Sequence, residues 1–205
     1  MAFFDNLKNQ AMQAAREEGS GAAQNLGQAA KSAADYTGNR TYRVTLSRIP
    51  VNLAQLQAMP EADLTKPENT AALTIAALCM YPVDREAACE MLNFLQGPKG
   101  LSGYDRQFLV DRFRDKDYVP RSYFSGATPQ NNYEPAMPYT LNFFENPYSR
   151  DNFSEGYLTL HINSGGADSA RQVKLRRKPS TGQWFLWEQF LLSDIRQPVS
   201  ADPWA

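Results

Sequence analysis

YLTLHIN at residues 157–163, ARQVKLRRK at 170–178 and QWFLWEQFLL at 183–192 decide the fold class of this chain. In the first two segments apolar side chains alternate with polar ones, which is the pattern of half-buried β-strands. A Pro-Ser-Thr-Gly turn at 179–182 joins the last two segments, and Gly182 permits the positive φ angle that such a turn needs. We therefore expect an antiparallel sheet in the C-terminal half.

Apolar residues recur at helical spacing between the first strand and the sheet. The predicted helices cover residues 53–58, 67–80, 84–96 and 104–113. Asp84 is a suitable N-cap for the third helix, and Gly97-Pro98 ends it. The fourth helix alternates acidic and basic residues on its polar side, and we interpret these charges as a solvated face.

Proline-rich sequence at 118–150 limits the other strands to short segments. We predict strands at 119–124 and 139–145, and Tyr42–Leu46 alternates as a candidate further strand. The whole is an α+β fold, in which a helical N-terminal half is followed by a four- or five-stranded antiparallel sheet.

Residues 1–40 differ from the rest because Ala, Gln, Asn and Gly dominate them. Two weak amphipathic helices, at 4–15 and 22–33, flank a Gly-Ser-Gly break. We expect a helical or partly disordered N-terminal extension followed by one globular domain at 41–205. The extension could dock a partner helix, and residues 1–38 could contact a membrane peripherally. We also expect the domain to fold without residues 1–38.

The tryptophan-rich strand at 183–191 is apolar on both sides. Alternation places Trp184, Leu186 and Phe190 on one face, with Phe185, Trp187 and Leu191 on the other. Because either face would expose a large apolar area if it were left in water, we predict a central strand that is covered on both sides.

Composition excludes several classes of function. The 205 residues are 42% hydrophobic with a net charge of −1, so no global field attracts nucleic acid or anionic lipid. The first residues lack the pattern of a secretory signal, and no apolar run is long enough to span a bilayer, so we expect a cytoplasmic protein. Two cysteines in apolar helices and one histidine favour neither a metal site nor a cofactor.

One motif resembles a phosphate loop. Ser164, Gly165, Gly166, Asp168 and Ser169 match the SGGxDS string of ATP pyrophosphatases. In that family the loop opens a helix, whose N-terminus holds pyrophosphate. Here the sequence that follows alternates as a strand. We therefore expect no nucleotide binding.

Basic and aromatic residues provide two further candidate surfaces. Strand alternation places Lys174, Arg176 and Lys178 on one face, and Tyr157 or Trp184 could stack bases if they shared it. Nothing in the sequence shows that they do, and no nucleic-acid partner is expected. Tyrosines are suited to recognition surfaces, and the candidates here are Tyr123, Tyr133, Tyr139 and Tyr148.

Catalysis is the competing interpretation. His161 and a nearby carboxylate could serve a hydrolase or a transferase, but no spacing selects a pair. The candidate carboxylates are Glu145, Asp151, Glu155, Glu188 and Asp194.

Residues 41–205 resemble an uncharacterised bacterial family known only as a domain of unknown function. The likeness depends on a tryptophan-rich strand and an IRxP tail: Trp184, Trp187, Glu188, Ile195, Arg196 and Pro198. The resemblance implies no activity. We therefore expect a non-catalytic cytoplasmic binding or scaffolding protein, with a protein partner or a second copy as its ligand.

Overall fold

The computed structural model describes residues 2–17, 40–201 and 204. The helices are α1 (Ala2–Glu17), α2 (Leu53–Gln57), α3 (Pro67–Met80), α4 (Arg85–Gln96) and α5 (Gly103–Phe113). The strands are β1 (Thr41–Leu46), β2 (Tyr139–Phe144), β3 (Tyr157–Ile162), β4 (Arg171–Arg177) and β5 (Trp184–Gln189). Short 3₁₀ helices used below are η2 (Gly97–Lys99), η3 (Pro120–Tyr123), η5 (Phe153–Glu155) and η6 (Val199–Ala201).

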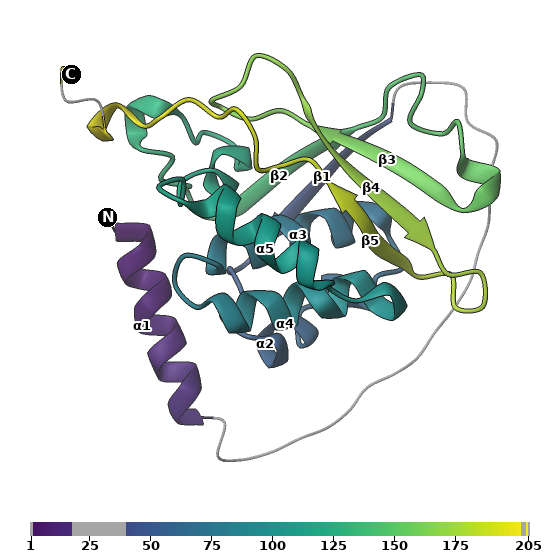
Figure 1. Cartoon of the computed structure of the whole chain (residues 1–205), viewed down its shortest axis with the longest axis horizontal. Coiled ribbons are helices and arrows are strands. Elements are labelled where there is room, and N and C mark those ends of the chain that lie inside the picture. The colour runs from purple at the N-terminus through teal and green to yellow at the C-terminus, as the bar shows by residue number, and fades with distance from the viewer. Residues whose placement is uncertain (1, 18–39, 202–203, 205) are drawn as a thin grey trace.

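The five strands form one antiparallel sheet in the order β1-β2-β3-β4-β5 (Figure 1). Each strand pairs antiparallel with the next strand along the chain, and the β1–β2 connection also contains α2, α3, α4 and α5. The α+β prediction is confirmed, including the membership of Tyr42–Leu46 in the sheet.

Helix α3 covers the inner face of the sheet. Every residue from Thr70 to Met80 is buried, and the helix packs on β1, β3, β4 and β5. Many of these residues are alanines, whose small side chains let helix and sheet approach closely. The hydroxyl of Thr70 donates to the carbonyl oxygen of Trp184 at 2.8 Å and fixes the helix to β5. In Figure 1, α2, α3 and α4 lie on the same side of the sheet.

Helix α4 begins and ends where the sequence predicts. The Asp84 carboxylate accepts from the backbone N–H of Ala87 at 3.0 Å. The helix ends at Gln96 because Gly97 adopts a φ of +56°, which favours glycine. A Cβ atom at Gly97 would overlap the Phe185 ring, so this glycine also lets β5 approach the helix end.

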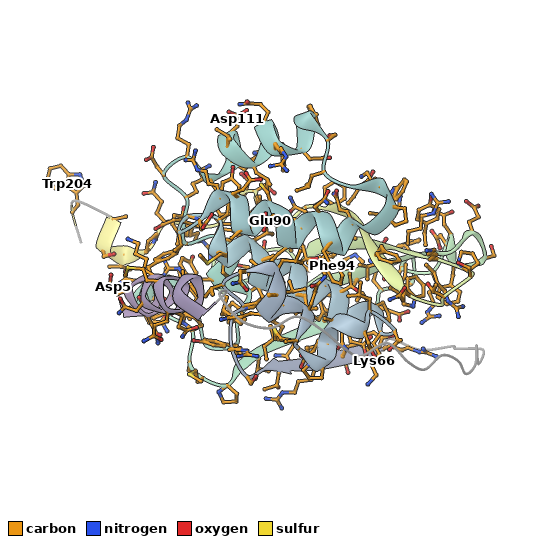
Figure 2. The ribbon with its side chains drawn as sticks, turned by 90° about the horizontal axis from the view of Figure 1, so that it is seen from below. Asp5, Lys66, Glu90, Phe94, Asp111 and Trp204 are labelled. Carbon is orange, nitrogen blue, oxygen red and sulfur yellow. The ribbon has the colours of Figure 1, made fainter. Side chains whose placement is uncertain are left out.

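Helix α5 carries its charges in solvent, as the sequence predicts. Ser102 and Asp105 form a capping box at its start. Asp111 is exposed, and Figure 2 shows it pointing away from the body of the protein. These charged residues therefore form a solvated face.

The strand predicted at 119–124 is wrong. This segment is the 3₁₀ helix η3, whose four residues are all buried. Pro120 has a fixed φ and no N–H to donate to a ladder, and it starts the helical turn instead. Buried side chains favour both conformations, so the apolar content alone did not distinguish them.

The prediction of a central β5 is also wrong, because β5 lies at the edge of the sheet. A β-bulge explains the error in its faces: Lys174 pairs with Glu188 and Leu175 with Leu186, which leaves Trp187 as the extra residue. The alternation reverses beyond the bulge. Phe190 is consequently 51% exposed, whereas Trp184 and Leu186 are buried on the inner face.

The N-terminal helix is part of the fold. Phe3 and Leu7 of α1 are buried in the main core, and the backbone N–H of Phe3 donates to the Glu134 carboxylate at 3.1 Å. The guanidinium of the buried Arg121 lies 4.3 Å from the Phe4 ring centre and 3.6 Å from Glu134. The helix predicted at 22–33 lies outside the described residues.

We predict that Phe3→Ala lowers the free energy of unfolding by about 3 kcal/mol, because it empties a buried aromatic position. Met12→Ala on the same helix is the control, since Met12 is 59% exposed. Chemical denaturation measures both. A Phe3→Ala variant as stable as wild type would support the expectation that residues 1–38 are dispensable.

Replacing each of the two tryptophans of β5 should lower the free energy of unfolding by a different amount. Trp184→Ala should cost about 3–5 kcal/mol, because Trp184 is buried. Trp187→Ala should cost only about 1–2 kcal/mol, because Trp187 is half-buried. Denaturant unfolding of the two variants provides the comparison, and equal losses would contradict the partial exposure of Trp187 on the outer face.

Candidate binding site on the open face of the sheet

The outer face of β3, β4 and β5 gathers cations and aromatic rings. Tyr157 pairs with Arg176, and Thr159 pairs with Lys174, so strand alternation places all four on the face opposite α3. Trp187 of β5 lies on this face too, and its ring meets Tyr157 edge to face at 5.6 Å between centres. Tyr157 and Trp187 therefore share a face with the basic residues of β4.

The rings of Tyr157 and Trp187 each contact two cationic side chains. The Arg176 guanidinium lies 5.1 Å from the Tyr157 ring centre and 4.9 Å from that of Trp187. The Lys174 ammonium lies 5.2 Å from Tyr157, and that of Lys99 lies 4.9 Å from Trp187. Such contacts are worth about 0.5–1 kcal/mol each at exposed positions. They hold the charged groups in place before any ligand arrives.

The short helix η2, which follows α4, also contributes to this surface. The turn at Gly97 directs η2 beneath the edge of β5, where the Lys99 ammonium donates to the Trp187 carbonyl oxygen at 2.8 Å. Glu188 is the carboxylate that pairs with this group of cations, at 3.9 Å from Lys174. We call Lys99, Tyr157, Lys174, Arg176 and Trp187 the cation–aromatic cluster.

A groove of about 440 Å³ lies between η2 and the β4–β5 turn, next to the cluster. Its lining residues are Gln96, Pro98, Lys99, Arg176, Arg177, Lys178, Pro179, Phe185, Leu186 and Trp187. The walls are therefore proline, leucine and aromatic groups, and the rim carries four cations. A ligand with an apolar body and an anionic group fits this combination.

The sequence identified only part of this site. It placed Arg176 and Lys174 on one face, but named Trp184 as the second stacking candidate. Trp184 lies on the inner face, and the ring on the outer face is that of Trp187, which alternation had already placed opposite Trp184. Lys99 was missed, since only the turn after α4 brings it beneath β5, and no pattern in the sequence signals that contact.

Three of the four candidate recognition tyrosines do not lie on the surface. Tyr123, Tyr133 and Tyr139 are buried, and only Tyr148 is exposed. The hydroxyls of Tyr123 and Tyr133 donate to the carbonyl oxygens of Leu191 and Arg196. Burial of these phenols is possible because the C-terminal segment supplies their hydrogen-bond partners.

The SGGADS loop is built into the protein rather than open to phosphate. The N–H of Gly165 donates to the Ser122 carbonyl oxygen at 2.9 Å, and the N–H of Gly166 donates to the Ser164 hydroxyl at 3.0 Å. A Cβ atom at Gly165 would overlap the Ala127 carbonyl oxygen, and one at Gly166 would overlap the Tyr133 hydroxyl. The glycines therefore serve close packing.

The two arginines beside this loop, Arg171 and Arg196, already have hydrogen-bond or ion-pair partners within the protein. Asp168 forms an ion pair with Arg196, and the Ser169 hydroxyl accepts from Arg171 at 2.8 Å. Arg171 also donates to the carbonyl oxygens of Ser193 and Asp194. A shallow depression of about 530 Å³ lies here, but these guanidinium groups hold the loop and the tail together.

His161 belongs to a buried polar cluster at the start of the β2–β3 connection. Its Nε2 lies 3.2 Å from the Asn146 amide nitrogen, and its Nδ1 lies 3.3 Å from the Ser149 hydroxyl. With Asn146 donating to Nε2, the ring is neutral and Nδ1–H donates to Ser149. In this arrangement the imidazole does not accept a proton from Ser149, as a catalytic base would.

Glu145 in the adjoining chain is held by other partners. Its carboxylate accepts from the Tyr42 hydroxyl and from Arg150 at 2.9 Å. Burial raises the pKa of Glu145, but hydrogen bonds from Arg150 and Tyr42 outweigh it and leave the pKa below its ordinary value. Burial likewise lowers the pKa of His161. At neutral pH the Glu145 carboxylate is therefore ionised and the His161 ring is neutral, and in these forms both groups stabilise the β2–β3 connection.

We predict that acid destabilises the protein through His161. The unfolded chain protonates this residue near its ordinary pKa of about 6.5, whereas the native pKa is lower. Unfolding free energy should therefore fall as pH drops below about 6.5, by at most about 1.4 kcal/mol per pH unit. His161→Gln should flatten this part of the profile in denaturation measured from neutral to mildly acidic pH. A profile unchanged by the substitution would contradict the neutral buried state.

Neither the cysteines nor an acidic cluster marks a further site within the described residues. Cys79 and Cys89 are free and buried, and burial raises the pKa of Cys79 to about 12, so its thiol is protonated at neutral pH. No group of three or more potential metal-ligating side chains comes together in residues 2–17, 40–201 and 204. Within the same residues, no helix is both long enough and apolar enough to cross a membrane.

Comparison with known proteins identifies a family. Residues 48–199 match the family described as "Domain of unknown function (DUF6935)". No curated protein and no solved structure matches the chain. The match includes the whole groove and all five members of the cation–aromatic cluster, and it excludes α1 and β1.

Proposed function

We propose that this chain, which belongs to the DUF6935 family, is a non-catalytic binding protein that holds an acidic segment of a protein partner. The cation–aromatic cluster carries the proposal. Four positive side chains, Lys99, Arg176, Arg177 and Lys178, surround an apolar groove. A carboxylate-rich segment with one bulky apolar residue would satisfy both parts of the site.

The cluster is suited to binding because it is preorganised. The Arg176 guanidinium lies 5.1 Å from the Tyr157 ring centre and 4.9 Å from that of Trp187, and Lys99 is fixed by its bond to the Trp187 carbonyl oxygen. Long charged side chains lose rotamer freedom when they bind a ligand, and prior ordering reduces that cost. The planar guanidinium also matches a carboxylate in two hydrogen bonds.

Nucleic acid fits the surface less well than an acidic peptide. Stacking of bases needs accessible ring faces along a phosphate path, and here Lys99, Lys174 and Arg176 already lie over the rings. The net charge of −1 provides little attraction at a distance. A protein segment that places one apolar residue in the groove uses the site more completely.

We place this activity in the cytoplasm, where thiols stay reduced. The two free, buried cysteines support that compartment. Peripheral membrane contact through residues 1–38 would compete with the fold, because Phe3 and Leu7 on the apolar side of α1 are buried in the domain. The structure therefore favours a protein ligand over a lipid surface.

The proposal is tested with a synthetic peptide in which one tryptophan is flanked by glutamates. Fluorescence anisotropy should show saturable binding that weakens as salt is added, since the contact depends on charge. Lys99→Glu and Arg176→Glu should each weaken it at least about tenfold, or about 1.4 kcal/mol. Arg114→Glu, an exposed residue at the end of α5, makes the same charge change elsewhere and should have no effect.

Matched probes separate the two parts of the site. Replacing the tryptophan with alanine, or the glutamates with glutamines, should weaken binding in each case. The proposal fails if the peptide does not bind, or if the two site variants bind it as wild type does. It also fails if a single-stranded oligonucleotide binds more tightly than the peptide.

A further inference from the structure

The two edges of the sheet differ in how their backbone groups are protected. On β5 the Trp184 N–H donates to the Leu64 carbonyl oxygen. The Trp187 carbonyl oxygen accepts from the Lys99 ammonium, and a bulge interrupts the pairing of this strand with β4. At the other edge, β1 pairs with β2 in an unbroken register over all six of its residues. Its outward side is therefore the regular edge of the sheet.

The register of β1 shows which of its backbone groups point outward. The Glu145 N–H donates to the Arg40 carbonyl oxygen at 2.8 Å, and these two residues follow the pair of Thr41 with Phe144. Hydrogen-bonded pairs alternate along an antiparallel ladder. From residue 40 onward, every second residue of β1 therefore bonds to β2. The residues between them direct their N–H and carbonyl groups away from β2: Thr41, Arg43 and Thr45.

These outward backbone groups have no hydrogen-bond partner among the residues that the structure describes. The strand also contains neither a proline nor a bulge, two features that commonly protect an edge. A regular, unpaired edge is a template for a further strand. Backbone hydrogen bonds along such an edge bind extended peptides in several classes of protein.

The side chains of β1 define which segment fits beside it. Its outer face is exposed, whereas Val44 and Leu46 on the inner face are buried. Residues 40–52 include three arginines and no acidic residue. Of these arginines, Arg43 and Arg48 are exposed and form no ion pair with any described residue. Opposite residues in a sheet share a face, so an acidic residue beside Arg43 would satisfy its charge.

A second copy of the chain does not supply such a segment. Two β1 strands side by side would bring Arg43 and Arg48 of both copies together, with no acidic residue in either strand. Like charges on neighbouring strands destabilise their pairing. Charge complementarity therefore favours an acidic segment of another protein.

We propose that an extended segment of a partner protein, in which acidic and apolar residues alternate, adds to β1 as a further strand. It runs antiparallel to β1, as in every other pair of this sheet. Its acidic residues exchange backbone hydrogen bonds with Thr41, Arg43 and Thr45, and its apolar residues extend the inner face beside Val44. The inference goes beyond the proposed function, because it concerns the edge of the sheet opposite the groove.

A short fluorescent peptide in which glutamate alternates with valine tests the inference on the full chain. Fluorescence anisotropy should show saturable binding. Arg43→Glu should weaken that binding at least about fivefold, because an attraction between exposed charges becomes a repulsion. Arg114→Glu makes the same charge change at the end of α5 and should bind the peptide as wild type does.

Methyl groups on the peptide nitrogens distinguish strand pairing from charge attraction alone. Methylation of the glutamate nitrogens should abolish binding, because in an antiparallel pair these N–H groups donate to β1. Methylation of the valine nitrogens should leave binding intact, because those N–H groups point away from the sheet. Equal effects of the two methylated peptides would overturn the inference.

Thr45→Pro tests the backbone of β1 directly. It removes one outward N–H and should weaken binding about tenfold, and an edge strand tolerates proline where the N–H faces solvent. Thr45→Val keeps the N–H and should bind as wild type does. The inference is overturned if the peptide does not bind, or if Arg43→Glu or a Thr45→Pro variant with an unchanged circular dichroism spectrum binds it as wild type does.

Arg176→Glu separates this surface from the groove. The glutamate–valine peptide has no ring to place in the groove, so Arg176→Glu should bind it as wild type does. Binding that is lost in Arg176→Glu and kept in Arg43→Glu would place the peptide in the groove. That result would overturn the β1 surface and leave the proposed function standing.

Discussion

Coverage of the sheet by α3 on one face only is the constraint on which the rest of the structure depends. The buried side of this helix, Thr70–Met80, fills the inner face, and inward residues such as Leu160 and Val173 are fully buried against it. The outer face of β3, β4 and β5 must then be made compatible with water. Here lysine and arginine side chains lie over Tyr157 and Trp187, which keeps aromatic area from water while placing charge at the surface.

The edge position of β5 creates the second part of the site. An edge strand offers unpaired backbone groups and needs protection. Here the Trp184 carbonyl oxygen accepts from Thr70, that of Trp187 accepts from Lys99, and the Trp184 N–H donates to the Leu64 carbonyl oxygen. Gly97 lets the end of α4 approach Phe185 closely, which places Lys99 for its bond to Trp187. The groove is therefore a consequence of how the edge is covered.

Local signals in the sequence were sufficient for most elements and insufficient for the site. Asp84 and Gly97 set the ends of α4, and alternation identified β3 and β4. The bulge at Trp187 was not predictable, because it depends on the pairing of β4 with β5. Burial of Tyr123 and Tyr133 was equally hidden, since their hydroxyls bond to carbonyl oxygens 68 and 63 residues away. Lys99 joins the cluster only through tertiary packing, so residue type and spacing gave no sign of it.

The central claim is that the outer face of β3, β4 and β5, together with the end of α4, is a preformed site for an acidic segment. Backbone amide NMR during titration with the glutamate–tryptophan peptide tests this claim most directly. We predict that the shift changes concentrate at residues 96–99, 174–179 and 185–188, and that amides of α3 change little. Changes centred on α1 or on residues 164–169, with the groove unaffected, would contradict the account.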